Sequence, residues 1–147
     1  MRSWGGAAAL LLLAGCGSGV DALLQDTNVA AGGFADGTFA GASSPDDLGA
    51  TGEVELTIAG GDITQVTFRV RQPDGTLKDA EYGKVGGEIL SEQLYQQAQK
   101  AVAAQVTYAQ ELEALDDLSQ VDVVTGASIT YKSFVGAVAD ALAKARL

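Results

Sequence analysis

One stretch near the end of the chain, Asp122 to Tyr131, contains the residue types and spacing best suited to chemistry. It reads Asp-Val-Val-Thr-Gly-Ala-Ser-Ile-Thr-Tyr, an apolar segment followed by a turn through Gly126 and a hydroxyl residue, Ser128, where a helical pattern begins. Junctions of a strand, a turn and a helix present backbone N–H groups and the positive end of the helix dipole to an anion. The stretch therefore predicts an anion site that suits a phosphate.

A sheet is expected upstream of this stretch, because polar and apolar residues alternate there. Its strands are predicted over residues 34–41, 53–58 and 66–71. Gly60 and Gly61 indicate a tight hairpin between the second and third strands, and Ile63 is out of phase with the third, so a bulge or a longer turn is expected. The inward face is predicted to consist of Val54, Leu56, Ile58, Val66, Phe68 and Val70.

Helical periodicity predicts the remaining elements. A long helix is expected over 88–115, a short strand over 121–124 and a final helix over 131–146. The β-branched residues around Thr107 make a break in the long helix an open alternative, and Tyr108 beside it is interpreted as core packing rather than a cofactor contact. The predicted fold class is α+β, with an antiparallel β-meander packed against a long helix and a C-terminal helix.

Composition excludes several kinds of function. The 147 residues suit one domain and include nine Lys and Arg against 19 Asp and Glu, a balance that argues against nucleic-acid binding. There is no histidine and one cysteine, Cys16, so we expect no metal site of the usual ligands and no nucleophile activated by histidine. Any redox chemistry must then be carried by an organic cofactor.

The N-terminus resembles a bacterial lipoprotein signal. Arg2 is followed by a short apolar run and by Leu13-Ala14-Gly15-Cys16, in which the peptide is cut before a cysteine that becomes lipidated. The alternative is an ordinary signal peptide with a chance cysteine. The expected organisation is a signal over 1–15, lipidated Cys16 with a flexible tether over 16–33, and a domain over 34–147. Lipidation would anchor the protein on the outer or periplasmic side of the cell membrane.

The order of these features, together with the motif Asp-x-x-Thr-Gly-Ala-Ser at 122–128, resembles the FMN-binding domain family. That family includes the flavin-carrying subunits of the bacterial sodium-pumping quinone reductase and of the Rnf complex, and small lipoproteins. The resemblance implies an FMN-binding-domain-like fold and FMN joined by a phosphoester bond to the last hydroxyl of the motif. A flavin transferase that uses FAD and magnesium makes this bond.

Carried onto this chain, the resemblance makes Ser128 the covalent FMN acceptor, and Asp122, Thr125, Gly126 and Ala127 complete the motif. The family's acceptor is more often threonine, whereas this chain has serine. Asp122 is interpreted as part of what the transferase recognises, because a serine without histidine is not a self-sufficient nucleophile. The alternative is a plain turn with an N-cap serine.

Further residues that lie outside the motif are predicted to contribute to the site. Thr130 is expected to cap the last helix, and Lys132, near its start, to offset the phosphate charge. Between residues 77 and 87, Lys78 and Tyr82 either belong to a surface loop or contact the ligand. No catalytic residue and no metal ligand are assigned.

The leading functional hypothesis is an extracytoplasmic electron-transfer lipoprotein with covalent FMN. It would accept electrons from a membrane reductase or a quinol-linked donor and pass them to another carrier or an external acceptor. The alternatives are a non-redox binding lipoprotein with the same fold and a flavin reductase acting on a small molecule. Whether the chain is an enzyme stays open, because it shows no obvious catalytic acid or base.

Overall fold

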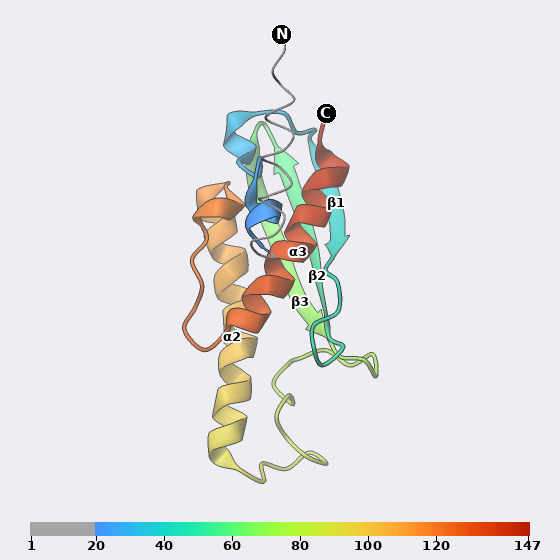
Figure 1. Ribbon diagram of the computed structural model, residues 1–147, viewed down its shortest axis with the longest axis vertical. Helices are drawn as coiled ribbons and strands as arrows, with labels where there is room; N and C mark the ends of the chain where they lie inside the picture. The colour runs from blue at the N-terminus through green and yellow to red at the C-terminus, as the bar shows by residue number, and fades with distance from the viewer. Residues whose placement is uncertain (1–19) are drawn as a thin grey trace, which may run out of the picture.

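The computed structural model describes residues 20–147 of the chain. Signal residues 1–15 and Cys16 lie outside these described residues. A three-stranded sheet forms one layer, and two long helices pack on it (Figure 1). The predicted α+β class is confirmed.

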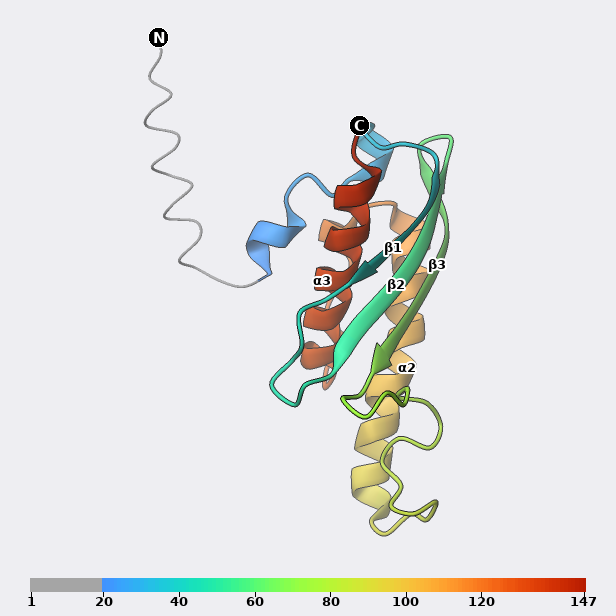
Figure 2. The same cartoon turned by 90° about the vertical axis from the view of Figure 1, so that its right-hand side faces the viewer.

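The sheet is an antiparallel meander in the order β1-β2-β3 (Figure 2). Its strands are β1 Gly37–Ala42, β2 Thr51–Ala59 and β3 Asp62–Arg71. The hairpin turns at Gly60 and Gly61, whose φ angles of 63° and 87° favour glycine. A register shift between Thr57 and Ile58 lets both Ile63 and Val66 point inward, which confirms the predicted irregularity. The six residues predicted for the inner face are all buried.

The two helices cover the inner face of the sheet. They are α2, Glu92–Leu115, which packs along β3, and α3, Ser128–Ala145, which packs on β1 and β2. Phe68 of β3 meets Phe134 of α3 edge to face, with ring centroids 4.9 Å apart. Gly41 allows the close approach of α3, because a Cβ atom there would lie 2.1 Å from the carbonyl oxygen of Ala137. The core therefore sits between one sheet face and two helices.

The long helix is shorter than predicted at its N-terminus and is continuous. It begins after Ser91, whose hydroxyl accepts the Leu94 N–H at 3.4 Å, so the predicted start at Glu88 was wrong. There is no break at Thr107, whose hydroxyl donates to the Ala103 carbonyl at 3.4 Å within the helix. Asp116, in a left-handed conformation at φ 57°, ends the helix.

The strand predicted over 121–124 is absent. These residues follow a short 3-10 helix, η3 Leu118–Gln120, and form no ladder with the sheet. They run as an irregular segment from the top of α2 toward the start of α3 (Figure 1). The last helix begins at Ser128, as the motif predicts, and not at Tyr131, where the apolar periodicity placed its start. The motif is therefore a loop-turn-helix junction.

Residues 20–33, the described part of the tether predicted over 16–33, have local structure and contact the core. This part contains two 3-10 turns, η1 Asp21–Leu24 and η2 Val29–Ala31, and Val29 is fully buried in the core. The Val29 N–H donates to the Asp116 carbonyl at 2.8 Å, and Thr27 is buried as well. The packed domain therefore extends upstream of the predicted boundary at Phe34.

Side chains from the two helices and from the C-cap of α2 bond to backbone groups on both open edges of the sheet. Along β3, the Ile63 N–H donates to Asp116 and the Val66 N–H to Glu113, at 2.7 and 2.6 Å. Along β1, Asp140 accepts the Ala42 N–H at 3.0 Å, and Lys144 donates to the Ala40 carbonyl at 2.7 Å. Edge groups that are satisfied in this way are poor templates for pairing with another chain.

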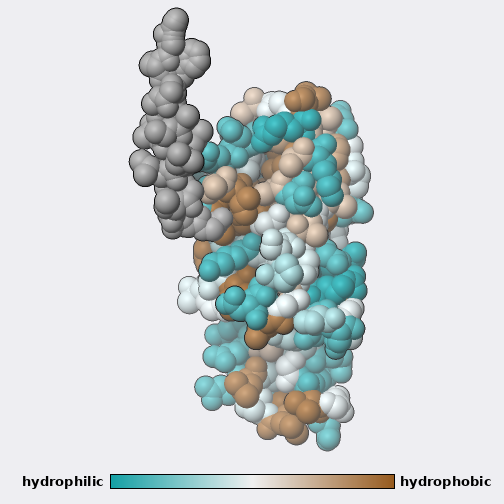
Figure 3. Space-filling model, turned by 45° about the vertical axis from the view of Figure 1, so that its right-hand side comes forward, coloured by the Kyte–Doolittle hydropathy of each residue, from teal (hydrophilic) through white to brown (hydrophobic). Residues whose placement is uncertain are grey.

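The segment over 72–91 forms an irregular extension below the sheet, beside the first turns of α2 (Figure 1). Apolar side chains gather at this lower end of the molecule (Figure 3). Within the 72–91 segment, Val85 and Leu90 are 60% and 72% exposed. Within residues 20–147, no helix has the length and apolarity needed to cross a bilayer.

Candidate functional site

The turn of the motif has a backbone that requires glycine. Gly126 has a φ of 85°, and the Ala127 N–H closes the turn by donating to the Val124 carbonyl at 2.9 Å. Apart from Gly126 and its two neighbours in the chain, no residue has a heavy atom within 4 Å of the position where a Cβ of Gly126 would be. The turn is therefore both conformationally demanding and open on its outer side.

Ser128 is the first residue of α3, and this helix start has no cap. Its N-cap residue, Ala127, has no side chain that could accept a hydrogen bond, and the Ser128 hydroxyl bonds to nothing within residues 20–147. The backbone N–H groups of Ser128, Ile129 and Thr130 likewise have no partner in this part of the chain. A helix start with free donors and an exposed hydroxyl is suited to bind an anion.

Thr130 does not cap the helix, contrary to the prediction. It lies inside the first turn and is only 6% exposed, so its side chain points into the protein. Ala127 is also buried, at 3% exposed, and its small side chain fits the core rather than leaving space at the surface. Of the two small residues Gly126 and Ala127, Gly126 is the one with open space at its Cβ position.

Tyr108 of α2 fixes the turn from inside the protein. Its hydroxyl accepts the Val124 N–H at 2.9 Å and donates to the Ala127 carbonyl at 3.0 Å. The side chain is fully buried, and burial raises the pKa of Tyr108, so the hydroxyl stays protonated and can donate. One phenol thus joins the residues on both sides of Thr125 and Gly126.

A second tyrosine supports the same segment. The Tyr131 hydroxyl donates to the Val121 carbonyl at 3.3 Å, and its ring meets the Tyr108 ring edge to face, with centroids 5.6 Å apart. Burial, with a contribution from the Asp122 carboxylate, raises the pKa of Tyr131. The segment from Val121 to Ala127 is therefore bound at three backbone positions by two buried phenols.

The other predicted site residues near the turn differ in exposure and in their contacts. Asp122 and Thr125 are exposed, and the Asp122 carboxylate makes no hydrogen bond to Ser128. The Asp122 N–H donates to Glu111 of α2 at 3.4 Å, which positions its backbone. Lys132 lies one turn after Ser128 on the same face of α3, and its ammonium has no ion-pair partner among residues 20–147.

Lys78 and Tyr82 contact each other, and neither hydrogen-bonds to the motif. The Lys78 ammonium lies 4.7 Å from the centroid of the Tyr82 ring. Gln105, one turn before Tyr108 on α2, donates to the Lys78 carbonyl at 3.3 Å. The 72–91 segment and the motif are thus attached to successive turns of the same helix, without a direct polar contact between them.

Together these features define a small α+β domain with an uncapped helix start, an exposed serine and a glycine turn held from inside. The sequence model of the FMN-binding domain family matches residues 48–143, so the chain belongs to this family. The CPE2226 protein from Clostridium perfringens has a similar fold, with a TM-score of 0.60 and 17% identity over 76% of this chain and 88% of that one. No curated protein matches.

The residues of the site fit a flavin phosphate. An FMN phosphate needs hydrogen-bond donors and room for its oxygens, which the free N–H groups of α3 and the open turn at Gly126 provide. The family assignment therefore agrees with the local geometry. Sequence reasoning missed Tyr108 as a positioning residue; its only signal was a phenol on the buried side of a long helix.

Proposed function

We propose that this protein is an extracytoplasmic electron-transfer lipoprotein that carries FMN through a phosphoester bond to Ser128. The phosphate would lie at the start of α3, and the isoalloxazine ring would supply the redox chemistry. A flavin transferase that uses FAD and magnesium would attach the FMN. A membrane reductase would donate the electrons, and acylated Cys16 would hold the protein on the outer or periplasmic side of the membrane.

The observation that carries the proposal is the uncapped start of α3. At α2, the Ser91 hydroxyl accepts a backbone N–H, as a helix-capping serine should. At α3, Ser128 lies one position later, inside the helix, and its hydroxyl makes no such bond. A serine whose oxygen is exposed and unbonded is available for modification, which argues against a simple N-cap serine.

The local charges favour a bound phosphate. The dipole of an 18-residue helix places partial positive charge at Ser128, an effect typically worth about 0.3 to 1 kcal/mol for an anion. Lys132 adds a full positive charge one turn away. The net charge of the whole chain is −10, so a local positive potential is needed for an anion to bind.

The mass of the intact, exported protein tests the covalent bond. Co-expressed with a flavin transferase, the parent chain should gain the mass of one FMN minus one water, and Ser128→Ala should not. Ser119→Ala removes another exposed serine hydroxyl, in η3, and should leave the gain unchanged. An unmodified parent protein, or a modified Ser128→Ala variant, would refute the attachment.

The non-redox alternative makes a different prediction. A binding lipoprotein that uses the fold without flavin would be colourless when purified from its native host. The proposed electron carrier should instead show flavin absorbance that bleaches on addition of a chemical reductant and returns in air.

A further inference from the structure

A groove runs beside the proposed attachment point, with a volume of about 370 Å³. One wall is the exposed face of α3, with Ile129, Lys132 and Gly136. The other wall is the loop between β1 and β2, including Leu48. Val20 and Leu23 of the described N-terminal segment also line the groove. Figure 2 shows this loop beside the lower end of α3. The volume lies within the range of about 300 to 1,000 Å³ typical of ligand pockets.

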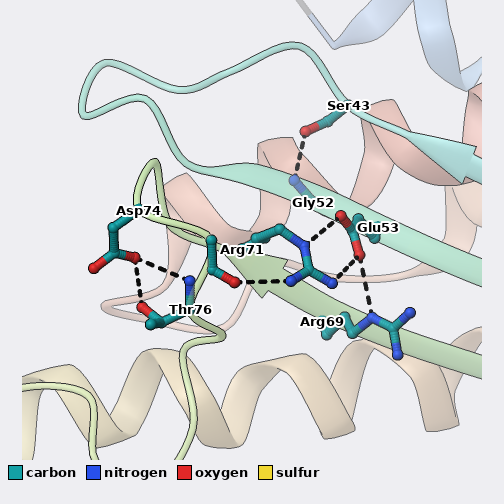
Figure 4. Close-up of polar contacts among 8 residues, drawn as sticks. Ser43, Gly52, Glu53, Arg69, Arg71, Asp74 and Thr76 are labelled. Carbon is teal, nitrogen blue, oxygen red and sulfur yellow. Dashed lines mark hydrogen bonds and ion pairs between the residues drawn. The ribbon is translucent and has the colours of Figure 1, made fainter.

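The loop wall is fixed by its own hydrogen bonds. The Ser43 hydroxyl accepts the Gly52 N–H at 2.8 Å (Figure 4). The Asp46 carboxylate accepts the N–H groups of Leu48 and Ala50 at 2.8 and 2.9 Å. The groove is therefore a preformed feature, and the Asp46 charge is directed into its own loop.

Ser128 is a neighbour of groove-lining residues on α3. It precedes Lys132 by four residues and Ile129 by one, and both of these residues line the groove. Residues four apart on a helix are neighbours on one face. A group attached to the Ser128 oxygen therefore starts next to the groove.

We propose that the isoalloxazine ring of the flavin on Ser128 lies in this groove. The inference rests on the proposed function. The ring has an apolar dimethylbenzene edge and a polar pyrimidine edge. The groove offers matching surfaces, with exposed apolar side chains at Leu48 and Ile129 and a cation at Lys132.

Lys132 is the one cationic side chain among the residues that line the groove. Asp46 and Asp47 also line it; Asp46 is bound by its own loop, and Asp47 is exposed. Two-electron reduction of a flavin with uptake of one proton leaves one negative charge on the ring. A nearby ammonium stabilises that charge, so Lys132 should raise the reduction potential of the bound flavin.

Tryptophan substitutions test where the ring lies. An indole in contact with a flavin quenches its fluorescence by electron transfer in the excited state, so Leu48→Trp should lower the flavin emission several-fold. Leu90→Trp is the matched control, because Leu90 is equally exposed, 72% against 74% for Leu48, and lies outside the groove. Equal emission from the two flavin-loaded variants would overturn the placement of the ring.

The reduction potential tests the role of Lys132. Lys132→Gln should disfavour two-electron reduction about tenfold, which lowers the midpoint potential by about 30 mV. Lys132→Arg should restore it, and Lys100→Gln, on the exposed surface of α2, should leave it unchanged. An unchanged potential in Lys132→Gln would refute the role.

The intact mass of each variant distinguishes a failure of the groove inference from a failure of the proposed function, because it shows whether FMN is attached. If FMN is present and neither the emission nor the potential responds, the groove inference fails and the proposed function stands. If no variant and no parent protein carries FMN, both fail.

Discussion

The Tyr108→Phe substitution removes one oxygen and leaves the ring in place. The ring packs against Phe134, with centroids 5.5 Å apart, and against Tyr131, and these contacts persist in the variant. The change deletes the hydrogen bonds to the Val124 N–H and to the Ala127 carbonyl. It therefore tests the two hydrogen bonds by which Tyr108 holds the motif, here called the clamp, without creating a large cavity.

The two lost bonds have different consequences. The Ala127 carbonyl keeps the hydrogen bond from the Tyr131 N–H at 3.0 Å, whereas the Val124 N–H has no other partner among residues 20–147. A partly buried donor left without a partner costs about 1 to 3 kcal/mol. We therefore expect the free energy of unfolding to fall by about 2 kcal/mol, and the melting temperature to fall by roughly 5 to 10 °C.

Urea unfolding measures the stability, and the rate of FMN gain in intact mass measures the function of the clamp. Tyr108→Phe should unfold at lower urea and accept FMN more slowly, because the turn before Ser128 is less ordered. Tyr95→Phe loses one bond, to the Ala80 carbonyl at 2.8 Å, far from the motif, and should accept FMN at the parent rate. Parent-like unfolding and flavin attachment in Tyr108→Phe would refute the reasoning.

Three further changes test the fold and the site. The hydrogen bond from Arg71, opposed by desolvation and supported by a second from Arg69, lowers the pKa of Glu53 (Figure 4). Glu53→Gln should therefore be less stable than the parent above the ordinary glutamate pKa of about 4.3, and this difference should vanish as pH falls through the lowered pKa. Unfolding curves of both proteins across a pH series measure it. Gly41→Ala should destabilise by about 1 to 3 kcal/mol or more in urea, because its methyl meets the backbone of α3. Gly126→Ala should cost about 1 to 2 kcal/mol through its positive φ alone, since no atom blocks the methyl, and an unchanged urea midpoint would contradict this.

The sheet was predictable because its signals are local. Alternation identified the inner face, and the Gly60–Gly61 pair identified the hairpin. Val121 to Val124 has the same β-branched composition but forms no strand. The side chains of Glu113 and Asp116, at the end of α2, already accept two N–H groups on the open edge of β3. Strand formation needs a free edge, and sequence composition does not report which edges are covered.

The motif residues of the site could be predicted from the sequence, whereas the buried residue that holds them in place could not. Gly126 and Ser128 stand out in the sequence, because turn glycines and helix-start hydroxyls follow local rules. Tyr108 is separated from the motif by the end of α2 and all of η3. A periodic pattern shows that such a tyrosine is buried, but it does not show whether its hydroxyl bonds to a distant segment. The same limit applies to the groove, whose walls come from β1–β2 and α3 and meet only in the folded chain.

The packed N-terminal segment also changes the geometry of the proposed lipoprotein. A flexible tether over residues 16–33 would let the flavin move well away from the membrane, whereas Val20 already lines the groove beside α3. Four residue steps separate Val20 from Cys16, and an extended chain spans at most about 3.6 Å per residue, or roughly 14 Å in all. If Cys16 carries the lipid, the groove is thus held close to the membrane surface. A donor embedded in the bilayer would then reach the flavin more readily than a partner that requires the domain to move outward.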